Sequence, residues 1–542
     1  MQTVFTLMAL ALPVISLYGQ FLWSAPVFDD VNFLDGTEHA YYRNKLFSFE
    51  LRWLPYATFE WTRALLGLNL NWYHWGNLLL HLAASITLFF FLRRLFEHAL
   101  PTTQDSNQGL PPHWLAFFGA LLFALHPASV YAVSYLLQRT ILMATLFTLL
   151  TWGLFLEGLI REKQRWLLAS AASYLLAVLS KEHAIMAPAV AVALLVLVGK
   201  QPFRSQLRRI LPTFVLYGLI GLFVVFQYKS RHILGEAYEP VAADLLSRLG
   251  PDFDVRLAYP LSILTQCYLF FKYLCVWMIP SPAWMSVDIY QPFAVHFWSW
   301  PHTAGFIAFI AYPIAAFRLL LKKGILGLLG FALLCPWLLF ATELSTIRIQ
   351  ESFVLYRSYL WMAGAFAALP FVCQNLSAKQ ASIVLALTAS LMMPLSWLRL
   401  TTFSHPLLIW DDAARLVENE DYRPGMERIF FNRGTELIRV RHYAEAIEDM
   451  NTVIKLTAGT GNYEGLGYNN RAWAYQEQKQ YNLALRDYNK AIELMPENKH
   501  SHIGKAEVLE ATNDLSGALQ EFIKACQFGM PEACQRLKKK EP

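Results

Sequence analysis

Charged side chains are scarce in this sequence. Asp, Glu, Lys and Arg make up 16% of its 542 residues, whereas about 25% is usual for a soluble protein. Cysteine is also sparse, with six residues, and no spacing indicates a zinc site. Apolar residues reach 56%, which excludes a disordered chain and disfavours one large soluble domain. The composition therefore indicates a membrane protein.

The charges that are present are unevenly distributed. Residues 401–542 carry 18 basic and 21 acidic side chains, whereas residues 1–400 carry 27 and 19. We therefore predict an all-α protein with a polytopic membrane domain over 1–400. A linker over 401–427 and a water-soluble module over 428–542 would follow it.

Runs of about 20 mostly apolar residues predict membrane-spanning helices. The chain holds about 11 such runs, several of them short. They lie at 3–23, 75–95, 114–128, 139–158, 165–181, 184–200, 210–227, 301–320, 324–341, 358–375 and 381–398. The first run lacks a basic start and a clear cleavage site, so we expect a retained helix rather than a secretory signal.

The basic residues of the membrane domain fall in alternate predicted loops. They cluster at Arg93/Arg94, Arg161–Arg165, Lys200–Arg209, Lys322/Lys323 and Lys379. All five loops become cytoplasmic if the N-terminus is cytoplasmic, as the positive-inside rule requires. Eleven spans then place the C-terminal module on the outer side of the membrane.

One further apolar segment, 257–280, does not fit this count. If it crossed the membrane, every later loop would change sides. Lys272 lies in its middle and Pro260 and Pro280 bracket it. We therefore predict an interfacial or re-entrant helix, which is tolerated where protein or a wet cavity covers it.

The soluble module contains an internal repeat. Asn432-Arg433-Gly434 recurs as Asn470-Arg471-Ala472, and a shift of 34 then carries Ala472, Ala484 and Tyr488 to Ala506, Ala518 and Phe522. A 34-residue period with small and aromatic residues at these offsets is typical of tetratricopeptide repeats (TPRs). We predict three TPRs and a capping helix near 529–540. Arg433, Arg471 and Lys505 form a basic row, which we interpret as structural or solvated rather than as a ligand site.

Two cysteines differ from the others. Cys526 and Cys534 flank a Gly-Met-Pro turn in the soluble module, so a disulfide is feasible in an oxidising compartment. The other four lie in apolar segments and are interpreted as packing residues.

Ionisable residues that lie in predicted outer loops are candidates for a functional site, because such groups are costly near a membrane. The Asp29-Asp30 pair could supply a base or bind a metal, or it could be two solvated loop acids. Arg139 could bind a phosphate or anchor a helix in the headgroup layer. Lys181 and Glu182 could belong to a site or to a plain turn with a salt bridge.

Several stretches, in their order along the chain, resemble one family. They are Trp75-Gly76-Asn77-Leu78-Leu79-Leu80-His81, Phe123-Ala124-Leu125-His126-Pro127 with Ala132-Val133 and Gln138-Arg139, Ser180-Lys181-Glu182, and Arg357-Ser358-Tyr359-Leu360. Together with the TPRs, they resemble the transmembrane-and-TPR-containing protein O-mannosyltransferases and their bacterial relatives. The resemblance implies a GT-C glycosyltransferase with a polytopic helical body and an outward-facing active site. Its donor would be a sugar linked to a polyprenyl phosphate.

The resemblance also implies roles for individual residues. Asp29 or Asp30, with a slight preference for Asp30, would deprotonate the acceptor hydroxyl. The donor phosphate would contact basic residues, namely Arg139, Lys181, Arg348, Arg357 and Lys272. Further cavity residues would be His126, Glu182, Asp288 and Glu351. The resemblance leaves open whether a divalent metal takes part, and no other cofactor is expected.

The predicted protein is therefore a bacterial inner-membrane glycosyltransferase that transfers a sugar to a protein or glycan acceptor in the periplasm, where the TPR module would bind the acceptor. Membrane lipids are expected partners, and nucleic acid is not. An oligosaccharide ligase or polymerase using the same donor class is an alternative. A transporter or flippase with a TPR docking domain is another.

The topology can be tested by fusing a reporter to Pro542. We expect a periplasmic signal from alkaline phosphatase and none from a cytoplasmic reporter, because an odd number of spans separates the two termini. A fusion at Lys322 serves as the cytoplasmic control. A cytoplasmic signal at Pro542 would contradict the predicted orientation.

Overall fold

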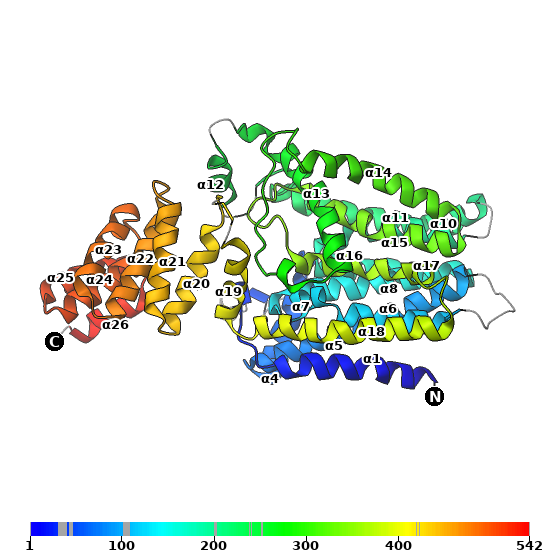
Figure 1. Ribbon diagram of the computed structural model, residues 1–542, viewed down its shortest axis with the longest axis horizontal. Helices are drawn as coiled ribbons and strands as arrows, with labels where there is room; N and C mark the ends of the chain where they lie inside the picture. The colour runs from blue at the N-terminus through cyan, green and yellow to red at the C-terminus, as the bar shows by residue number, and fades with distance from the viewer. Residues whose placement is uncertain are drawn as a thin grey trace. The chain divides into compact units, whose positions relative to one another are not determined.

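The computed structural model describes residues 2–540 apart from 31–40, 43–46, 101–108, 200–202, 238, 240, 251–252, 419 and 422. Its regular structure is helical (Figure 1). The chain divides into two compact units, Met1–His405 and Pro406–Pro542. The first unit thus ends five residues beyond the predicted membrane domain. The range predicted as a linker includes the end of one helix and all of another, α19 (Pro406–Val417).

The first unit is a bundle of long apolar helices. In Figure 1 most of them run alongside one another. They are α1 (Gln2–Tyr18), α4 (Trp53–Leu66), α5 (Leu70–Ala99), α6 (Pro112–Leu125), α7 (Pro127–Val133), α8 (Arg139–Arg161), α9 (Gln164–Ser180), α10 (Ala187–Val198), α11 (Phe203–Ser230), α12 (Ala242–Ser247), α13 (Ala258–Met278), α14 (His302–Leu321), α15 (Gly324–Phe340), α16 (Ser358–Met362), α17 (Leu369–Val372) and α18 (Ala378–Phe403). Short 3-10 helices, including η3 (Glu182–Met186), η6 (Ala341–Ser345) and η7 (Leu355–Arg357), connect some of them.

Within the described residues, eight helices are long and apolar enough to cross a membrane, or nine if the bent pair α6–α7 counts as one span. These helices are consistent with a membrane protein. The prediction of about 11 spans is higher for two reasons. The runs at 165–181 and 184–200 form helices of 17 residues each. The run at 358–375 is broken into α16, a 3-10 segment and α17.

The bend between α6 and α7 has a clear local cause. Pro127 cannot continue the hydrogen-bonding pattern of α6, and the two helices differ in direction by 61°. The Nδ1 atom of His126 accepts a hydrogen bond from the Ala128 N–H at 3.1 Å, which caps α7. Because Nδ1 is an acceptor, the ring proton must be on Nε2, which donates to the Trp277 carbonyl at 3.0 Å.

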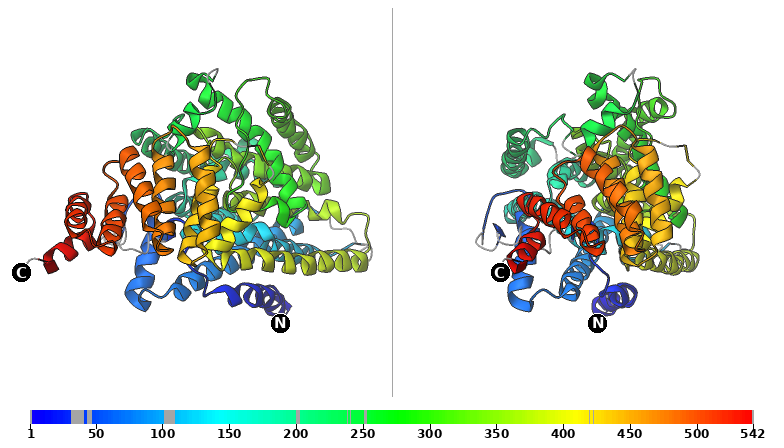
Figure 2. Two further views of the ribbon diagram at one scale, coloured as in Figure 1. Left: turned by 60° about the vertical axis from the view of Figure 1, so that its left-hand side comes forward. Right: turned by 90° about the vertical axis from the view of Figure 1, so that its left-hand side faces the viewer.

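Helix α13, which covers most of the 257–280 segment, lies across the bundle (Figures 1 and 2). Its first residue, Ala258, packs with Ile347, which follows α15. Near its other end, the Trp277 carbonyl contacts His126 at the end of α6. Both ends of α13 therefore lie at the side of the bundle where α6 and α15 end. By length and composition it counts among the eight candidates, but it is a continuous helix with no re-entrant break.

The second unit consists of consecutive helix pairs, drawn in orange to red in Figure 2. The pairs match the three predicted repeats: α20 (Glu427–Arg439) with α21 (Tyr443–Leu456), α22 (Asn462–Glu477) with α23 (Tyr481–Leu494), and α24 (Lys499–Ala511) with α25 (Leu515–Gln527). The predicted final helix is α26 (Pro531–Lys540). Ala484 and Ala518 are fully buried, which allows the helices to approach closely.

The basic row of the second unit is structural, as predicted. Arg433 contacts Asp449 at 2.7 Å, and Arg471 contacts Asp487 at 2.6 Å. In the third pair Lys505 contacts Glu521 at 3.1 Å. Each of the three cations thus ties the first helix of a pair to the second, 16 residues later. Arg471 also donates to Asn451 of the preceding repeat at 2.7 Å, so these cations have structural partners within the second unit.

A disulfide joins Cys526 of α25 to Cys534 of α26. It fastens the last helix to the repeat before it, because the loop that it closes is only eight residues long. We expect peptide mapping of the purified protein without reductant to recover the two cysteines as a linked pair that separates on reduction. Loss of a loop-closing disulfide of this size costs about 2–3 kcal/mol, so the Cys526→Ser variant should unfold its C-terminal repeat earlier.

Buried Cys335, which is a free thiol, is the control for this mapping, because it should be recovered unlinked. Complete alkylation of Cys526 and Cys534 under native, non-reducing conditions would show that the bond does not form. It would also remove the support that the bond gives to an oxidising compartment.

Candidate functional site

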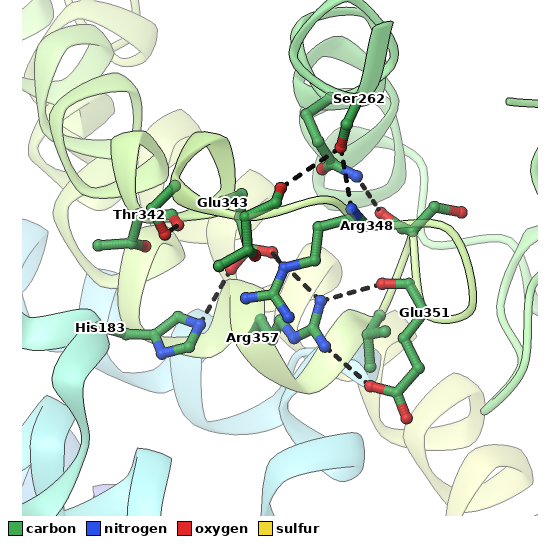
Figure 3. A network of polar contacts seen from close by, with 12 residues as sticks. His183, Ser262, Thr342, Glu343, Arg348, Glu351 and Arg357 are labelled. Carbon is green, nitrogen blue, oxygen red and sulfur yellow. Dashed lines mark hydrogen bonds and ion pairs between the residues drawn. The ribbon is translucent and has the colours of Figure 1, made fainter. Parts of the chain in front are cut away.

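A buried carboxylate, Glu343, lies at the centre of a polar cluster at one end of the first unit (Figure 3). It belongs to η6, directly after α15, and is 1% exposed. Its Oε1 atom lies 3.0 Å from Nε2 of His183. Its Oε2 atom accepts a hydrogen bond from Arg357 at 3.2 Å and lies 3.6 Å from Nε of Arg348. One acid therefore contacts three basic side chains, two from the stretch that follows it and one, His183, from a distant part of the chain.

The two arginines have additional acidic partners. Arg357 donates to the Glu351 carboxylate at 2.8 Å and to the Glu351 carbonyl at 3.0 Å. Arg348 lies 4.0 Å from Glu239, which also accepts backbone N–H bonds from the 349–350 turn. Both guanidinium groups are buried. Their pairing lowers the cost of burying charge here, which is otherwise several kcal/mol per ion.

The predicted Lys181–Glu182 turn joins this cluster. Glu182 forms a bidentate ion pair with Arg52, with one contact at 2.9 Å. Lys181 donates to Gln138 at 3.0 Å, and its ammonium lies 5.0 Å from the centre of the Tyr356 ring. The turn is therefore part of a continuous network rather than an isolated salt bridge.

The two aspartates of the predicted base have different environments. Asp30 is 1% exposed and accepts hydrogen bonds from the backbone N–H groups of Val27, Leu136 and Leu137 at 2.9–3.3 Å. Burial raises the pKa of Asp30 to about 7, and the three amides oppose this rise. Asp29 is exposed and accepts one hydrogen bond, from the Tyr135 hydroxyl at 3.1 Å. Only Asp29 presents a carboxylate that an acceptor can reach, so the geometry does not favour the preference for Asp30.

Aromatic rings connect Asp29 with the arginine cluster. The ring centres of Tyr135 and Tyr356 are 6.0 Å apart. The Tyr356 hydroxyl donates to Glu351 at 3.4 Å, and its ring lies 5.8 Å from the Arg357 guanidinium. The first-loop acid, the Lys181 turn and the Arg357 segment therefore meet at one end of the bundle.

An apolar cavity of about 220 Å³ adjoins this network. Its walls come mainly from η3, from α11 and from the segment around η6. The polar residues that line it are Glu182, His183, Tyr228, Thr342, Ser345 and Arg348, and apolar side chains such as Val224 and Met186 form much of the rest. The cavity thus combines a hydrophobic wall with a polar end that holds Arg348 and His183.

Two predicted site residues have structural contacts instead. Arg139 is buried, and its guanidinium donates to Asn77, Thr58 and the Tyr73 carbonyl at 2.9–3.3 Å. A Cβ atom at Gly76 would lie 2.6 Å from this group, so Gly76 gives it room. These contacts fasten α8 to α4 and α5. They leave Arg139 poorly placed to bind a phosphate.

His126 is the second such residue. Both of its ring nitrogens are occupied by backbone partners, so the ring is a helix cap and not a free base. The contacts of Arg139 and His126 follow from hydrogen-bond geometry that only the folded chain reveals.

The remaining predicted residues lie further from the cluster centre. Lys272 of α13 donates to Gln291 at 2.7 Å, and its ammonium lies 5.6 Å from the centre of the Phe353 ring. Asp288 lies, half-buried, in the segment between α13 and α14. Glu351 is at the cluster, on Arg357, and its side chain is 41% exposed. Within the described residues, no group of three or more His, Cys, Asp or Glu side chains could hold a metal ion.

Sequence reasoning missed several residues of the network. Glu343 is an acid at the end of the apolar run 324–341, and its position near a membrane was a usable signal. Tyr135, Tyr356 and Arg52 gave no comparable signal, because tyrosines and loop arginines are common at protein surfaces.

Comparison with known families gives one match. Residues 466–498 match the Tetratricopeptide repeat family, which corresponds to the second helix pair of the second unit. The match supports a protein-interaction role for this unit, because TPR arrays bind partners along their surfaces. A comparison with curated proteins finds no match.

Replacing each aspartate with asparagine should affect the stability of the protein differently, because Asp30 is buried and Asp29 is exposed. We expect Asp30→Asn to lower the free energy of unfolding by about 1–3 kcal/mol. The NH₂ group of the new amide would face backbone N–H groups, which also donate and so could not bond to it. Asp29→Asn should change it by less than about 0.5 kcal/mol, as is usual for exposed sites. Thermal or denaturant unfolding of both variants in the same detergent measures this difference. Equal stability of the two variants would show that the Asp30 contacts carry little energy.

Proposed function

We propose that this protein is a membrane glycosyltransferase that uses a sugar linked to a polyprenyl phosphate. The observation that carries the proposal is the apolar cavity that ends at Arg348 and His183 and adjoins the cluster around Glu343. A prenyl chain matches the hydrophobic wall, and a phosphate matches the polar end. The ordered resemblance to the O-mannosyltransferase family points to the same donor class.

The geometry supports different roles for Asp29 and for the arginine cluster. Asp29 is the base that takes the proton from the acceptor hydroxyl, because its carboxylate is exposed and oriented by Tyr135. Arg348 and Arg357 stabilise the phosphate that leaves. Lys181 adds positive charge beside Tyr356. The acceptor oxygen attacks the anomeric carbon from the side opposite the phosphate, which inverts the configuration.

The second unit supports the choice of a protein acceptor. A TPR module is a protein-interaction element, and its disulfide suits an oxidising compartment. We therefore propose a periplasmic protein as acceptor and the bacterial inner membrane as the location. A ligase or polymerase would use the same cavity with a glycan acceptor. A flippase would need no base at Asp29.

The proposal is tested by Asp29→Asn. Loss of a general base lowers transfer by about 10²–10⁴-fold, so we expect the glycan to disappear from periplasmic proteins in mass spectrometry while the protein level stays normal. Asp254→Asn is the matched control, because Asp254 is outside the network and pairs with Arg256. Unchanged glycosylation with Asp29→Asn would remove Asp29 as the base. If the purified protein instead moves a lipid-linked sugar from one leaflet of a vesicle membrane to the other without transferring the sugar to an acceptor, it is a flippase.

A further inference from the structure

His183 occupies an unusual position in the cavity wall. The residue belongs to η3 and is 4% exposed. Its Nε2 atom is engaged by Glu343 at 3.0 Å. Its Nδ1 atom is buried and has no hydrogen-bond partner in the part of the chain that the structure describes. Figure 3 shows the ring beside Glu343, with one nitrogen turned away from it. A buried polar atom that lacks a partner is costly and marks a place where a ligand group can bind.

Carboxylates flank the ring on both sides. Glu343 contacts one nitrogen at 3.0 Å, and Oε1 of Glu182 lies 3.6 Å from the other. The other ionisable groups around this position include Arg348 and Arg357 on Glu343, Arg52 and Lys181 near Glu182, and Tyr228 of α11 in the cavity wall.

The arginines are largely neutralised before any ligand arrives. Arg52 is paired with Glu182, Arg348 with Glu343 and Glu239, and Arg357 with Glu343 and Glu351. An incoming phosphate therefore meets guanidinium groups that already have counterions. An imidazole is a type of side chain that can both accept and release a proton near neutral pH, and His183 is the imidazole that lines this cavity.

We propose that His183 is a catalytic residue that protonates the departing phosphate through Nδ1. The inference rests on the proposed function. Glu343 is the positioning residue, because it holds Nε2–H whether the ring is charged or neutral. Histidine is suited to this task because its charge changes near neutral pH.

The proposed sugar transfer involves one substitution at the anomeric carbon and two proton transfers. The acceptor oxygen forms a bond to the anomeric carbon, and its proton goes to Asp29. The bond from that carbon to the phosphate oxygen breaks, and its electron pair stays on the phosphate. Nδ1–H of His183 gives its proton to this oxygen, so the lipid leaves as a hydrogen phosphate and the ring becomes neutral. Asp29 then loses its proton to solvent, and His183 takes one from solvent.

The test uses farnesyl phosphate, a short polyprenyl phosphate, with the full-length protein in detergent. This probe represents the leaving group after the carbon–oxygen bond has broken. Calorimetry in buffers of different ionisation enthalpy gives both the affinity and the number of protons taken up on binding. At pH 8 we expect the wild type to take up about one proton more than His183→Gln, because one imidazole titrates. We expect His183→Gln to bind about tenfold more weakly.

The His183→Gln variant is chosen because it should preserve the contact with Glu343. The amide introduced by His183→Gln can still donate to Glu343, because it reaches the place of Nε2, whereas nothing replaces Nδ1. His296→Gln is the matched control, since His296 is exposed and lies outside the cavity; it should keep both affinity and proton uptake.

The outcomes distinguish failure of the role of His183 from failure of the proposed function. Equal affinity and equal proton uptake in wild type and His183→Gln would overturn the role of His183 and leave the proposed function in place. A wild type that does not bind farnesyl phosphate would overturn both. In cells, loss of the glycan with Asp29→Asn but not with His183→Gln would also overturn the assignment of His183.

Discussion

The polar end of the first unit depends on one buried carboxylate. Glu343 contacts Arg348 and Arg357 in the stretch that follows it and His183 of the distant η3. Neither the acid nor the arginines could be buried alone, because an unpaired charge in an apolar interior is strongly destabilising. The shared contacts therefore fix where η3, η6 and η7 lie relative to one another. They also place basic groups beside an apolar cavity without exposing them to lipid.

Hydropathy and repeat spacing were enough to predict the architecture, but not its details. Matching positions in the first and second helix pairs are 38 residues apart, and those in the second and third pairs are 34 apart, as Arg433, Arg471 and Lys505 show. Alanines such as Ala484 and Ala518 recur because small residues are required at the helix contacts. The described residues hold fewer candidate spans than the predicted 11, because an apolar run carries no information on where a helix breaks. The run at 358–375 divides into short pieces around Ala363–Ala368. Helix α13 is apolar enough to cross, yet contacts at both of its ends hold it across the bundle.

The candidate site was only partly predictable, for a physical reason. Charge at membrane depth identified Asp30, Arg139 and Lys181 alike, but such a group can be retained for structure as well as for chemistry. Arg139 and Asp30 are saturated by backbone and side-chain partners within the fold, whereas Asp29 and the Nδ1 atom of His183 are not. The difference lies in hydrogen-bond geometry between residues more than 100 positions apart, such as Asp30 and Leu137. Sequence patterns do not encode that geometry directly.

The same reasoning applies to the motifs that carry the family resemblance. In the Trp75–His81 stretch, Gly76 and Asn77 receive the Arg139 side chain, and His81 bonds to the Tyr359 hydroxyl at 2.7 Å and to the Ala124 carbonyl at 3.0 Å. These residues hold α5, α6, α8 and α16 together. The stretches that carry the resemblance therefore consist largely of residues that hold the helices of the first unit together.

The position of α11 has a consequence for how the proposed prenyl-linked donor would reach the cavity. Val224 and Val225 line the cavity, while Leu222 and Phe226 on the same helix are strongly exposed, as expected of a surface that faces lipid. A prenyl-linked donor would then reach the cavity by lateral diffusion within the bilayer. Its availability would be set by its mole fraction among the membrane lipids and not by a concentration in water. Saturation curves measured at different total lipid concentrations would therefore coincide only when rate is plotted against the mole fraction of donor in the membrane.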